Sequence, residues 1–164
     1  MGQITLASDG DHLVGLWLEN QKYFGQTATD EITEKPNLPL FKTVKRWLDQ
    51  YFKGKQPNVS DLSLRPVGGE FRQAVWGMLC EIPYGELITY GEIAKKIAKK
   101  MKKASMSSQA VGGAVGHNPI SIIIPCHRVI GANGNLTGYA GGIDKKIKLL
   151  NLEGVDTTRL HLPK

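Results

Sequence analysis

A change in hydrophobic period along the chain limits its fold more than any other feature. Near the N-terminus, apolar and polar residues alternate at positions 4–7 and 12–18, and Ser8-Asp9-Gly10-Asp11 separates the two runs. Alternation with a period of two and an Asp-Gly turn predict a β-hairpin. From residue 40 onward, apolar residues recur every three or four positions, which is the period of an amphipathic helix. The sequence therefore predicts an α+β protein whose hairpin lies at the N-terminal end.

The first part of the chain is predicted to form a small sheet-plus-helix domain. Residues 40–51 carry apolar side chains at helical spacing: Leu40, Val44, Trp47, Leu48 and Tyr51. Such a helix can cover one face of the hairpin, and residues 59–64 are expected to add a short strand. The run Pro66-Val67-Gly68-Gly69 has the composition of a linker. We therefore expect one domain over residues 1–66 and a second over 67–164.

The second domain is predicted to be mostly helical. Residues 71–82 repeat apolar side chains on one face, and Pro83-Tyr84-Gly85 ends that helix. Cys80 lies off the apolar stripe and is interpreted as a structural thiol. Thr89 and Glu92 have the spacing of a capping box, which marks the start of another helix.

Two consecutive helices in this half resemble a helix-turn-helix in outline. The first follows the capping box and carries a lysine-rich face: Lys95, Lys96, Lys99, Lys100, Lys102 and Lys103. The second follows a break at 105–108 and is rich in small residues: Gln109, Ala110, Val111, Gly112, Gly113, Ala114, Val115 and Gly116. Each glycine costs a helix about 1 kcal/mol relative to alanine, so a helix this thin needs a reason. Either another molecule approaches it closely, or it packs tightly inside the protein.

The positive charge is concentrated in the same half of the chain. Residues 1–84 contain 9 Lys and Arg and 10 Asp and Glu, a net charge of −1, whereas residues 85–164 contain 12 and 5, a net charge of +7. One-sided positive charge favours a polyanionic partner, because neutralised phosphates release counterions. A solvated basic surface that keeps the protein in solution explains the charge equally well.

Several classes of protein are not supported by the composition. No apolar run approaches the roughly 18 residues that a membrane span needs, and the N-terminus lacks the order of a secretory signal. The two cysteines, Cys80 and Cys126, lie far apart and are expected to be free thiols. The histidines show no metal-ligand spacing: His12, His117, His127 and His161. We expect a cytoplasmic protein with no membrane partner and no metal.

The stretch IIIPCHRV contains the most reactive combination of side chains. Ile120–Ile124 predicts a buried strand that Pro125 ends, so Cys126 is expected at a strand end. A thiol becomes a good nucleophile only when it loses its proton, and His127 and Arg128 are the nearest groups that could promote this. Adjacent side chains often diverge, so a bridging water is the more flexible link between thiol and imidazole. From these residues alone, Cys126 is either a nucleophile or a buried structural cysteine.

Four motifs around Cys126 follow one another in a specific order. They are His117-Asn118-Pro119, Ile124-Pro125-Cys126-His127-Arg128-Val129, Gly138-Tyr139-Ala140-Gly141-Gly142 and Leu149-Leu150-Asn151-Leu152-Glu153-Gly154. Together they resemble the O6-alkylguanine-DNA alkyltransferases, also called methylated-DNA–protein-cysteine methyltransferases, from about Phe71 to Gly154. The resemblance implies a small N-terminal domain with an RNase H-like outline, followed by a helical DNA-binding domain with a winged helix-turn-helix-like arrangement.

The resemblance also implies a single-turnover repair reaction on double-stranded DNA that contains O6-alkylguanine, and O4-alkylthymine as a further substrate. The alkyl group would move irreversibly to the sulfur of Cys126, with no cofactor consumed. His127 would draw the thiol proton through a water, and Glu153 would orient the imidazole. Asn118 would brace the loop that carries the cysteine. Tyr90 would assist the departure of guanine, although a tyrosine at this place could also be plain core.

The family likeness further implies a pocket for a base flipped out of the duplex. Tyr139 would pack against guanine, Ala140 and Gly141 would wall the pocket, and the carbonyls of Cys126 and Val129 would accept from the guanine amino group. The expected DNA contacts are Gln109, Ala110, Gly112, Gly113, Arg128, Thr89, Lys95 and Lys96. Ala114 would also allow close contact with the minor groove. One position departs from the family: Gln109 stands where an arginine normally fills the gap left by the flipped base.

Two other functions remain open from the sequence. A damage sensor would bind alkylated DNA without repairing it, and Gln109 is its only support. A thiol hydrolase would use Cys126 and His127 as a nucleophile and base, and would turn over repeatedly. The protein is expected to act as a monomer, and cooperative binding along DNA stays open.

Overall fold

The computed structural model describes residues 1–28 and 30–163. It contains two short strand pairs and five α-helices in an α+β arrangement, which confirms the predicted fold class. In chain order the elements are β1 (Ile4–Ser8), β2 (Leu13–Leu18), α1 (Pro39–Phe52), α2 (Glu70–Leu79), β3 (Ile88–Thr89), α3 (Tyr90–Lys100), α4 (Ser108–Gly116), β4 (Val129–Ile130) and α5 (Ile143–Leu152). None of the helices in the described ranges is long and apolar enough to cross a membrane.

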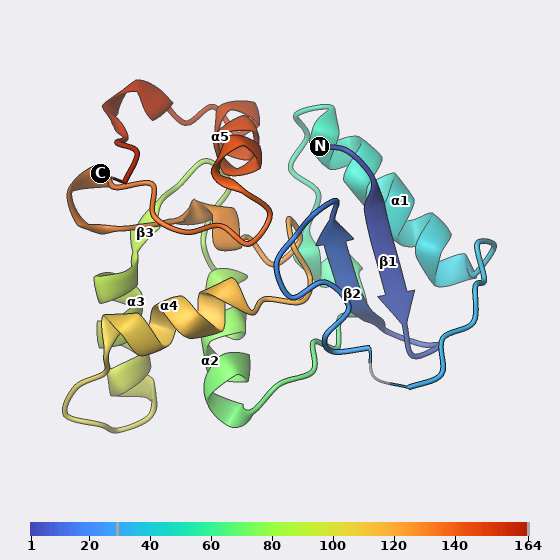
Figure 1. Cartoon of the computed structure of the whole chain (residues 1–164), viewed down its shortest axis with the longest axis horizontal. Helices are drawn as coiled ribbons and strands as arrows, with labels where there is room; N and C mark the ends of the chain where they lie inside the picture. The colour runs from blue at the N-terminus through green and yellow to red at the C-terminus, as the bar shows by residue number, and fades with distance from the viewer. Residues whose placement is uncertain (29, 164) are drawn as a thin grey trace.

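The N-terminal hairpin forms as predicted, and α1 lies alongside it (Figure 1). β1 and β2 pair antiparallel with Ile4 opposite Leu18, and the Asp9 carboxylate accepts from the backbone in the turn. The helical spacing is also confirmed, because α1 buries four of its predicted apolar residues: Val44, Trp47, Leu48 and Tyr51. The strand expected at 59–64 is wrong. Val59–Asp61 forms a 3-10 turn (η1), and in this described segment only Leu64 makes a β-bridge, to Leu13.

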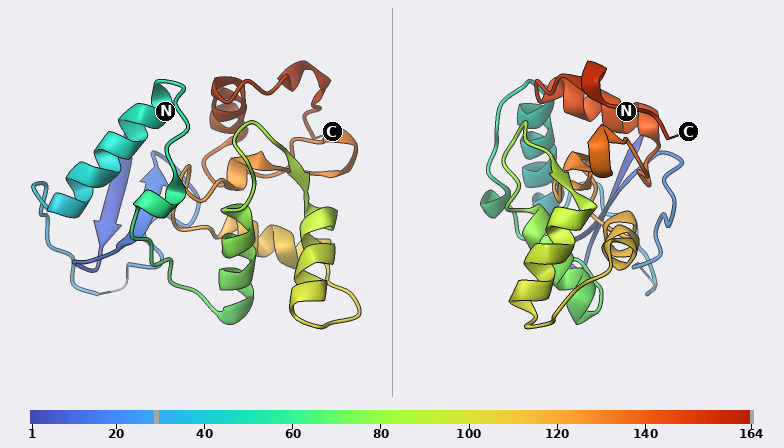
Figure 2. Two further views of the ribbon diagram at one scale, coloured as in Figure 1. Left: turned by 180° about the vertical axis from the view of Figure 1, so that it is seen from behind. Right: turned by 90° about the vertical axis from the view of Figure 1, so that its left-hand side faces the viewer.

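The remaining helices lie on the other side of the molecule, as Figures 1 and 2 show. α3 begins at the predicted capping box, in which Thr89 Oγ1 accepts from the Glu92 N–H at 3.2 Å and Glu92 Oε2 accepts from the Thr89 N–H at 2.8 Å. Trp76 on α2 is buried and donates from Nε1 to the Ala114 carbonyl at 2.9 Å. This bond ties α2 to α4.

The isoleucine run does not form the predicted strand. Ile120 makes one bridge, to Leu16 of β2, and residues 121–124 turn back on themselves with Ile122 at φ 69°. The side chains of residues 120–124 are all buried. The run is apolar because the protein surrounds this segment, and not because the segment pairs in a sheet. Ile124 N–H closes the turn on the Ile120 carbonyl at 3.1 Å. Cys126 therefore begins a 3-10 turn, η2 (Cys126–Arg128), and does not end a strand.

One hydrophobic core joins the hairpin to the helical part. Leu16 and Leu18 of β2 belong to the same buried cluster as Val75 of α2 and Ile93 of α3. The backbone of Leu16 also bonds directly to the cysteine-bearing loop, donating to Pro119 O at 2.8 Å and accepting from Ser121 N–H at 3.0 Å. The N-terminal strands thus help to fix the loop that presents Cys126.

Candidate active site

Cys126 lines a small pocket. Its side chain is buried, and both Cys126 and Cys80 are unpaired cysteines in the described structure. The pocket has a volume of about 170 Å³, below the roughly 300–1,000 Å³ of sites for larger ligands. Its lining residues are Lys22, Tyr23, Tyr90, Gly112, Val115, Gly116, Cys126, Gly138, Tyr139 and Ala140.

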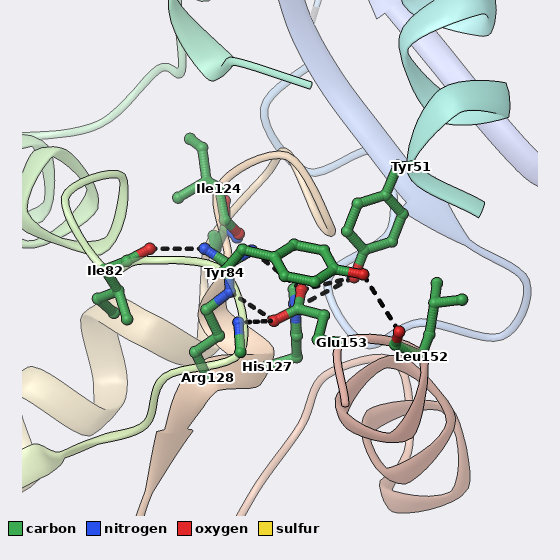
Figure 3. Close-up of polar contacts among 10 residues, drawn as sticks. Tyr51, Ile82, Tyr84, Ile124, His127, Arg128, Leu152 and Glu153 are labelled. Atoms are coloured by element: carbon green, nitrogen blue, oxygen red, sulfur yellow. Dashed lines mark hydrogen bonds and ion pairs between the residues drawn. The ribbon is translucent and has the colours of Figure 1, made fainter. Parts of the chain in front are cut away.

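A buried carboxylate, Glu153, lies beside the cysteine loop at the C-terminal end of α5. Its Oε1 accepts from His127 Nε2 at 2.6 Å, from the Tyr51 hydroxyl at 2.7 Å and from Arg128 Nη2 at 2.9 Å. Its Oε2 accepts from Arg128 Nε at 2.8 Å and from the Gly85 N–H at 3.1 Å. Figure 3 shows Tyr51, His127 and Arg128 converging on this one group. Glu153 thus connects four segments of the chain.

Glu153 is ionised in this network. Burial alone would raise the pKa of Glu153, but the hydrogen bonds from His127, Arg128 and Tyr51 outweigh it and hold the pKa well below its usual range. Burial has the opposite effect on the imidazole, lowering the pKa of His127 despite the neighbouring carboxylate. The stable state at neutral pH is a charged Glu153 next to a neutral His127.

This charge state fixes which nitrogen of His127 can act as a base. The short contact to ionised Glu153 requires the proton on Nε2, since a carboxylate only accepts. Nδ1 then carries the free lone pair, and it is buried with no hydrogen-bond partner in the described part of the chain. His127 is therefore arranged to accept a proton at Nδ1.

The Cys126 thiol needs such a base. Burial raises the pKa of Cys126, while Asn118 and the positive charge of Lys146 oppose the rise. Asn118 also braces the loop: its Nδ2 donates to the Ile124 carbonyl at 2.8 Å, and its Oδ1 accepts from the Ile120 N–H at 2.9 Å. At rest, Cys126 is therefore predominantly a thiol in a fixed position.

Two aromatic residues predicted at the pocket do line it. Burial raises the pKa of Tyr90, so its phenol stays a proton donor, and its hydroxyl donates to the Thr137 carbonyl at 3.3 Å. The Tyr139 hydroxyl is buried without a partner in the described residues. The loop after β2 adds a residue to the pocket lining that the sequence did not predict. This residue is Tyr23, whose ring stacks on His117 with ring centroids 3.9 Å apart.

Two other residues expected in the base pocket are not on its lining. Gly141 is buried, and a side chain there would meet Leu18 at 2.8 Å and the Tyr139 ring at 2.9 Å. Val129 is fully buried, and its carbonyl accepts from Lys146 Nζ at 2.5 Å. The Cys126 carbonyl likewise accepts from the Val129 N–H. Gly141 thus allows the loop to pack, and the carbonyls of Val129 and Cys126 each accept a hydrogen bond from within the protein.

Arg128 was expected to contact DNA, and the structure places it differently. It is 8% exposed, and its guanidinium is used by Glu153 and by the Ile82 carbonyl, which Nη1 reaches at 2.6 Å. A buried carboxylate needs a buried cation, so this arginine supports the active-site cluster and does not reach a surface partner.

The thin helix α4 presents its small residues to solvent on one side. Gln109, Ala110 and Gly113 are exposed, whereas Ala114, also expected at the DNA, is buried against Trp76. A Cβ on Gly113 would meet no described atom within 4 Å, and one on Gly112 would make only an ordinary contact with Tyr90. Internal packing therefore does not require these glycines, which favours close approach by another molecule.

The neighbouring helix supplies the positive charge. Lys95 and Lys96 are exposed on α3, with Thr89 capping its first turn. Helices α3 and α4 pack against each other, so the lysines and the small residues belong to one helix pair.

Two family models match the chain. The model described as "6-O-methylguanine DNA methyltransferase, ribonuclease-like domain" matches residues 1–66. The model described as "6-O-methylguanine DNA methyltransferase, DNA binding domain" matches residues 70–155. The chain belongs to the O6-methylguanine DNA methyltransferase family. This confirms the resemblance drawn from the four motifs.

Similar proteins span nearly the whole chain. A methylated-DNA–protein-cysteine methyltransferase of Methanosarcina acetivorans is 53% identical over 159 residues, which cover 94% of this chain and 93% of the relative. The Haemophilus influenzae protein of that name is 41% identical over 155 residues, covering 94% and 82%. The crystal structure of Mycobacterium tuberculosis OGT in complex with DNA has a TM-score of 0.77 at 41% identity, covering 96% of this chain and 88% of that one.

In this O6-methylguanine DNA methyltransferase family member, two buried polar residues at the site were not predicted. Tyr51 was assigned only to the apolar face of its helix. Lys146 is fully buried on α5, where its Nζ also donates to the Thr137 carbonyl at 3.1 Å, and burial lowers its pKa to about 8. Its spacing of three and four from Leu149 and Leu150 is the one sequence signal that places it on the buried face.

The lowered pKa of His127 predicts a pH-dependent stability. Below about pH 6.5 the unfolded chain binds a proton at this histidine that the folded protein does not, so unfolding becomes easier as the pH falls. Between pH 6.5 and 5, the free energy of unfolding of the wild type should fall by up to about 1.4 kcal/mol per pH unit more steeply than that of His127→Gln. Urea denaturation across this range measures both slopes, and equal slopes would contradict a neutral, buried His127.

Proposed function

We propose that the protein repairs O6-alkylguanine in double-stranded DNA by moving the alkyl group irreversibly to Cys126. The observation that carries this proposal is a buried thiol in a base-sized pocket, next to a histidine whose Nδ1 is free and whose Nε2 is held by ionised Glu153. The family membership and the likeness to a relative crystallised with DNA support the same reaction.

The chemistry begins with loss of the Cys126 proton. The thiol proton passes to His127 Nδ1, through a bridging water where the two groups do not touch, and Glu153 stabilises the imidazolium that forms. The sulfur then attacks the alkyl carbon on O6 of guanine. A C–S bond forms as the C–O6 bond breaks, and the electron pair of that bond stays on the guanine.

The departing guanine gains negative charge, which Tyr90 offsets. Tyr90 lines the pocket, its raised pKa keeps it protonated, and its long 3.3 Å bond to Thr137 is one that a base could replace. Tyr139 packs against the base, and Asn118 holds the loop that carries Cys126. The thioether product has no leaving group that water could displace, so each molecule acts once and no cofactor is consumed.

The DNA approaches through the helix pair. The exposed small residues of α4 fit the narrow minor groove, and Lys95 and Lys96 of α3 attract the phosphates. The target base must leave the stack to reach the pocket. Gln109 lies at the solvent-facing start of α4 and fills the gap in the duplex with an amide in place of a charged, planar guanidinium.

The proposal extends to the organisation and setting of the protein. Residues 1–66 form the first domain and residues 67–164 the domain that binds DNA and accepts the alkyl group. The protein acts as a monomer in the cytoplasm, and O4-alkylthymine is a second substrate. A damage sensor rests on Gln109 alone, and a thiol hydrolase has no specific observation in its favour.

Intact mass after incubation with duplex DNA carrying one O6-methylguanine tests the proposal. The wild type should gain one methyl group and saturate at one equivalent, and Cys126→Ser should gain none. Cys80→Ser is the matched control, because it removes the other unpaired cysteine and should react like the wild type. A bound but unmodified lesion would show a sensor, and repeated release of methylated product would show a hydrolase.

Gln109→Arg should speed repair of O6-methylguanine in duplex DNA by about ten-fold, because a stacked, charged guanidinium is worth about 1–2 kcal/mol more than an amide at such a site. Its reaction with the free base O6-benzylguanine, which needs no flipping, should stay at the wild-type rate. Single-turnover rate constants with the two substrates measure both effects. An equal change with both would show that Gln109 affects the chemistry and not lesion capture.

A further inference from the structure

We propose that Tyr51 is a positioning residue for the alkyl transfer, through which the N-terminal part of the chain sets the basicity of His127. This inference rests on the proposed function. It deepens that function by assigning a role to a side chain far from the reacting atoms in sequence.

Tyr51 is placed to act on Glu153 directly. It lies in the last turn of α1, is 1% exposed, and donates from its hydroxyl to Glu153 Oε1 at 2.7 Å. The same hydroxyl is 3.4 Å from His127 Nε2. Figure 3 shows Tyr51 reaching the carboxylate from α1, on the side opposite Arg128.

The direction of this hydrogen bond is fixed by chemistry. Burial and the neighbouring Glu153 raise the pKa of Tyr51 far above its usual range, so the phenol keeps its proton. Glu153 is ionised and can only accept, so the Tyr51 hydroxyl and the protonated Nε2 of His127 both act as donors to it. Tyr51 and His127 therefore donate to the same oxygen, Oε1.

Because both groups donate to the same oxygen, Tyr51 affects the pKa of His127. A second donor takes part of the negative charge of Oε1, which weakens the stabilisation that Glu153 gives to a protonated imidazole. Removing the hydroxyl should leave a more basic His127 and a less constrained carboxylate. The charged and titratable groups that face His127 come from three elements: Tyr51 of α1, Arg128 and Cys126 of η2, and Lys146 of α5 with Glu153 at its end.

Tyr51 is also the one member of this cluster that lies before residue 66. The other groups belong to the segment from Gly85 to Glu153. The packing of α1 against the helical part thus determines the contact between Tyr51 and Glu153, and Glu153 in turn bonds directly to His127.

The alternative is that Tyr51 only fills space. Its ring packs in the core, with Trp47 stacked at 5.7 Å and Tyr84 edge-on at 6.1 Å. Tyr51→Phe separates the two roles, since it keeps the ring and removes the hydroxyl. Tyr84→Phe is the matched control, because it also deletes one hydroxyl nearby, but that hydroxyl donates to the Leu152 backbone and not to Glu153.

The test is the single-turnover rate of methyl transfer from duplex DNA between pH 5 and 9, for the wild type and both variants. Burial keeps His127 of the wild type neutral over most of this range, so the rise of its rate with pH lies at the acid end. In Tyr51→Phe this rise should move to higher pH by about half a unit to one unit, which is the worth of one hydrogen bond. Tyr84→Phe should follow the wild-type profile.

A Tyr51→Phe profile that is lowered evenly, or that is unchanged, would overturn the proposal, as would an equal shift in Tyr84→Phe. If Tyr51→Phe does not fold, replacing Tyr51 by 3-fluorotyrosine, a stronger donor, should move the rise to lower pH, and no movement would overturn the proposal. Methyl transfer by the wild type and Tyr84→Phe in the same assay tests the proposed function separately.

Discussion

The hydrogen bond between Glu153 and His127 is the interaction on which the rest of the site depends. A buried carboxylate is stable only where donors replace its lost water, and here the donors come from Tyr51, His127, Arg128 and the Gly85 backbone. The hydrogen bonds to Glu153 therefore join α1, the turn after α2, η2 and α5. The same requirement fixes the histidine tautomer, so the packing of the domain and the acid–base chemistry have one physical cause.

The pocket around Cys126 and the helix pair α3–α4 lie next to this hydrogen-bond network. The buried Cys126 thiol has a raised pKa and needs the base that Glu153 prepares, while Asn118 holds its loop in place. The glycines at 112 and 113 have no packing reason within the described structure and leave room beside the pocket. A protein that inserts a thin helix into a groove and receives one base in a small pocket accounts for both features.

Local signals in the sequence predicted local structure well. The Asp-Gly hairpin, the amphipathic helix α1 and the Thr89–Glu92 capping box depend on residues a few positions apart, and all three formed. The isoleucine run failed because burial on all sides looks like a strand in sequence. Arg128 was expected at the DNA from the family likeness, but its buried partner Glu153 is not adjacent in sequence. Tyr51 gave no polar signal because Glu153 lies 102 positions away. The link from Cys126 to Glu153 came from the family motifs and not from residue spacing.

The central claim is that buried His127 is neutral and that Glu153 fixes its tautomer, with the proton on Nε2 and the lone pair on Nδ1. Nitrogen-15 NMR of the histidine-labelled protein at pH 7 measures this directly, with His127→Gln used to assign the signal. We predict a protonated Nε2 and an unprotonated Nδ1 for His127. A proton on Nδ1 alone, or on both nitrogens, would contradict the account.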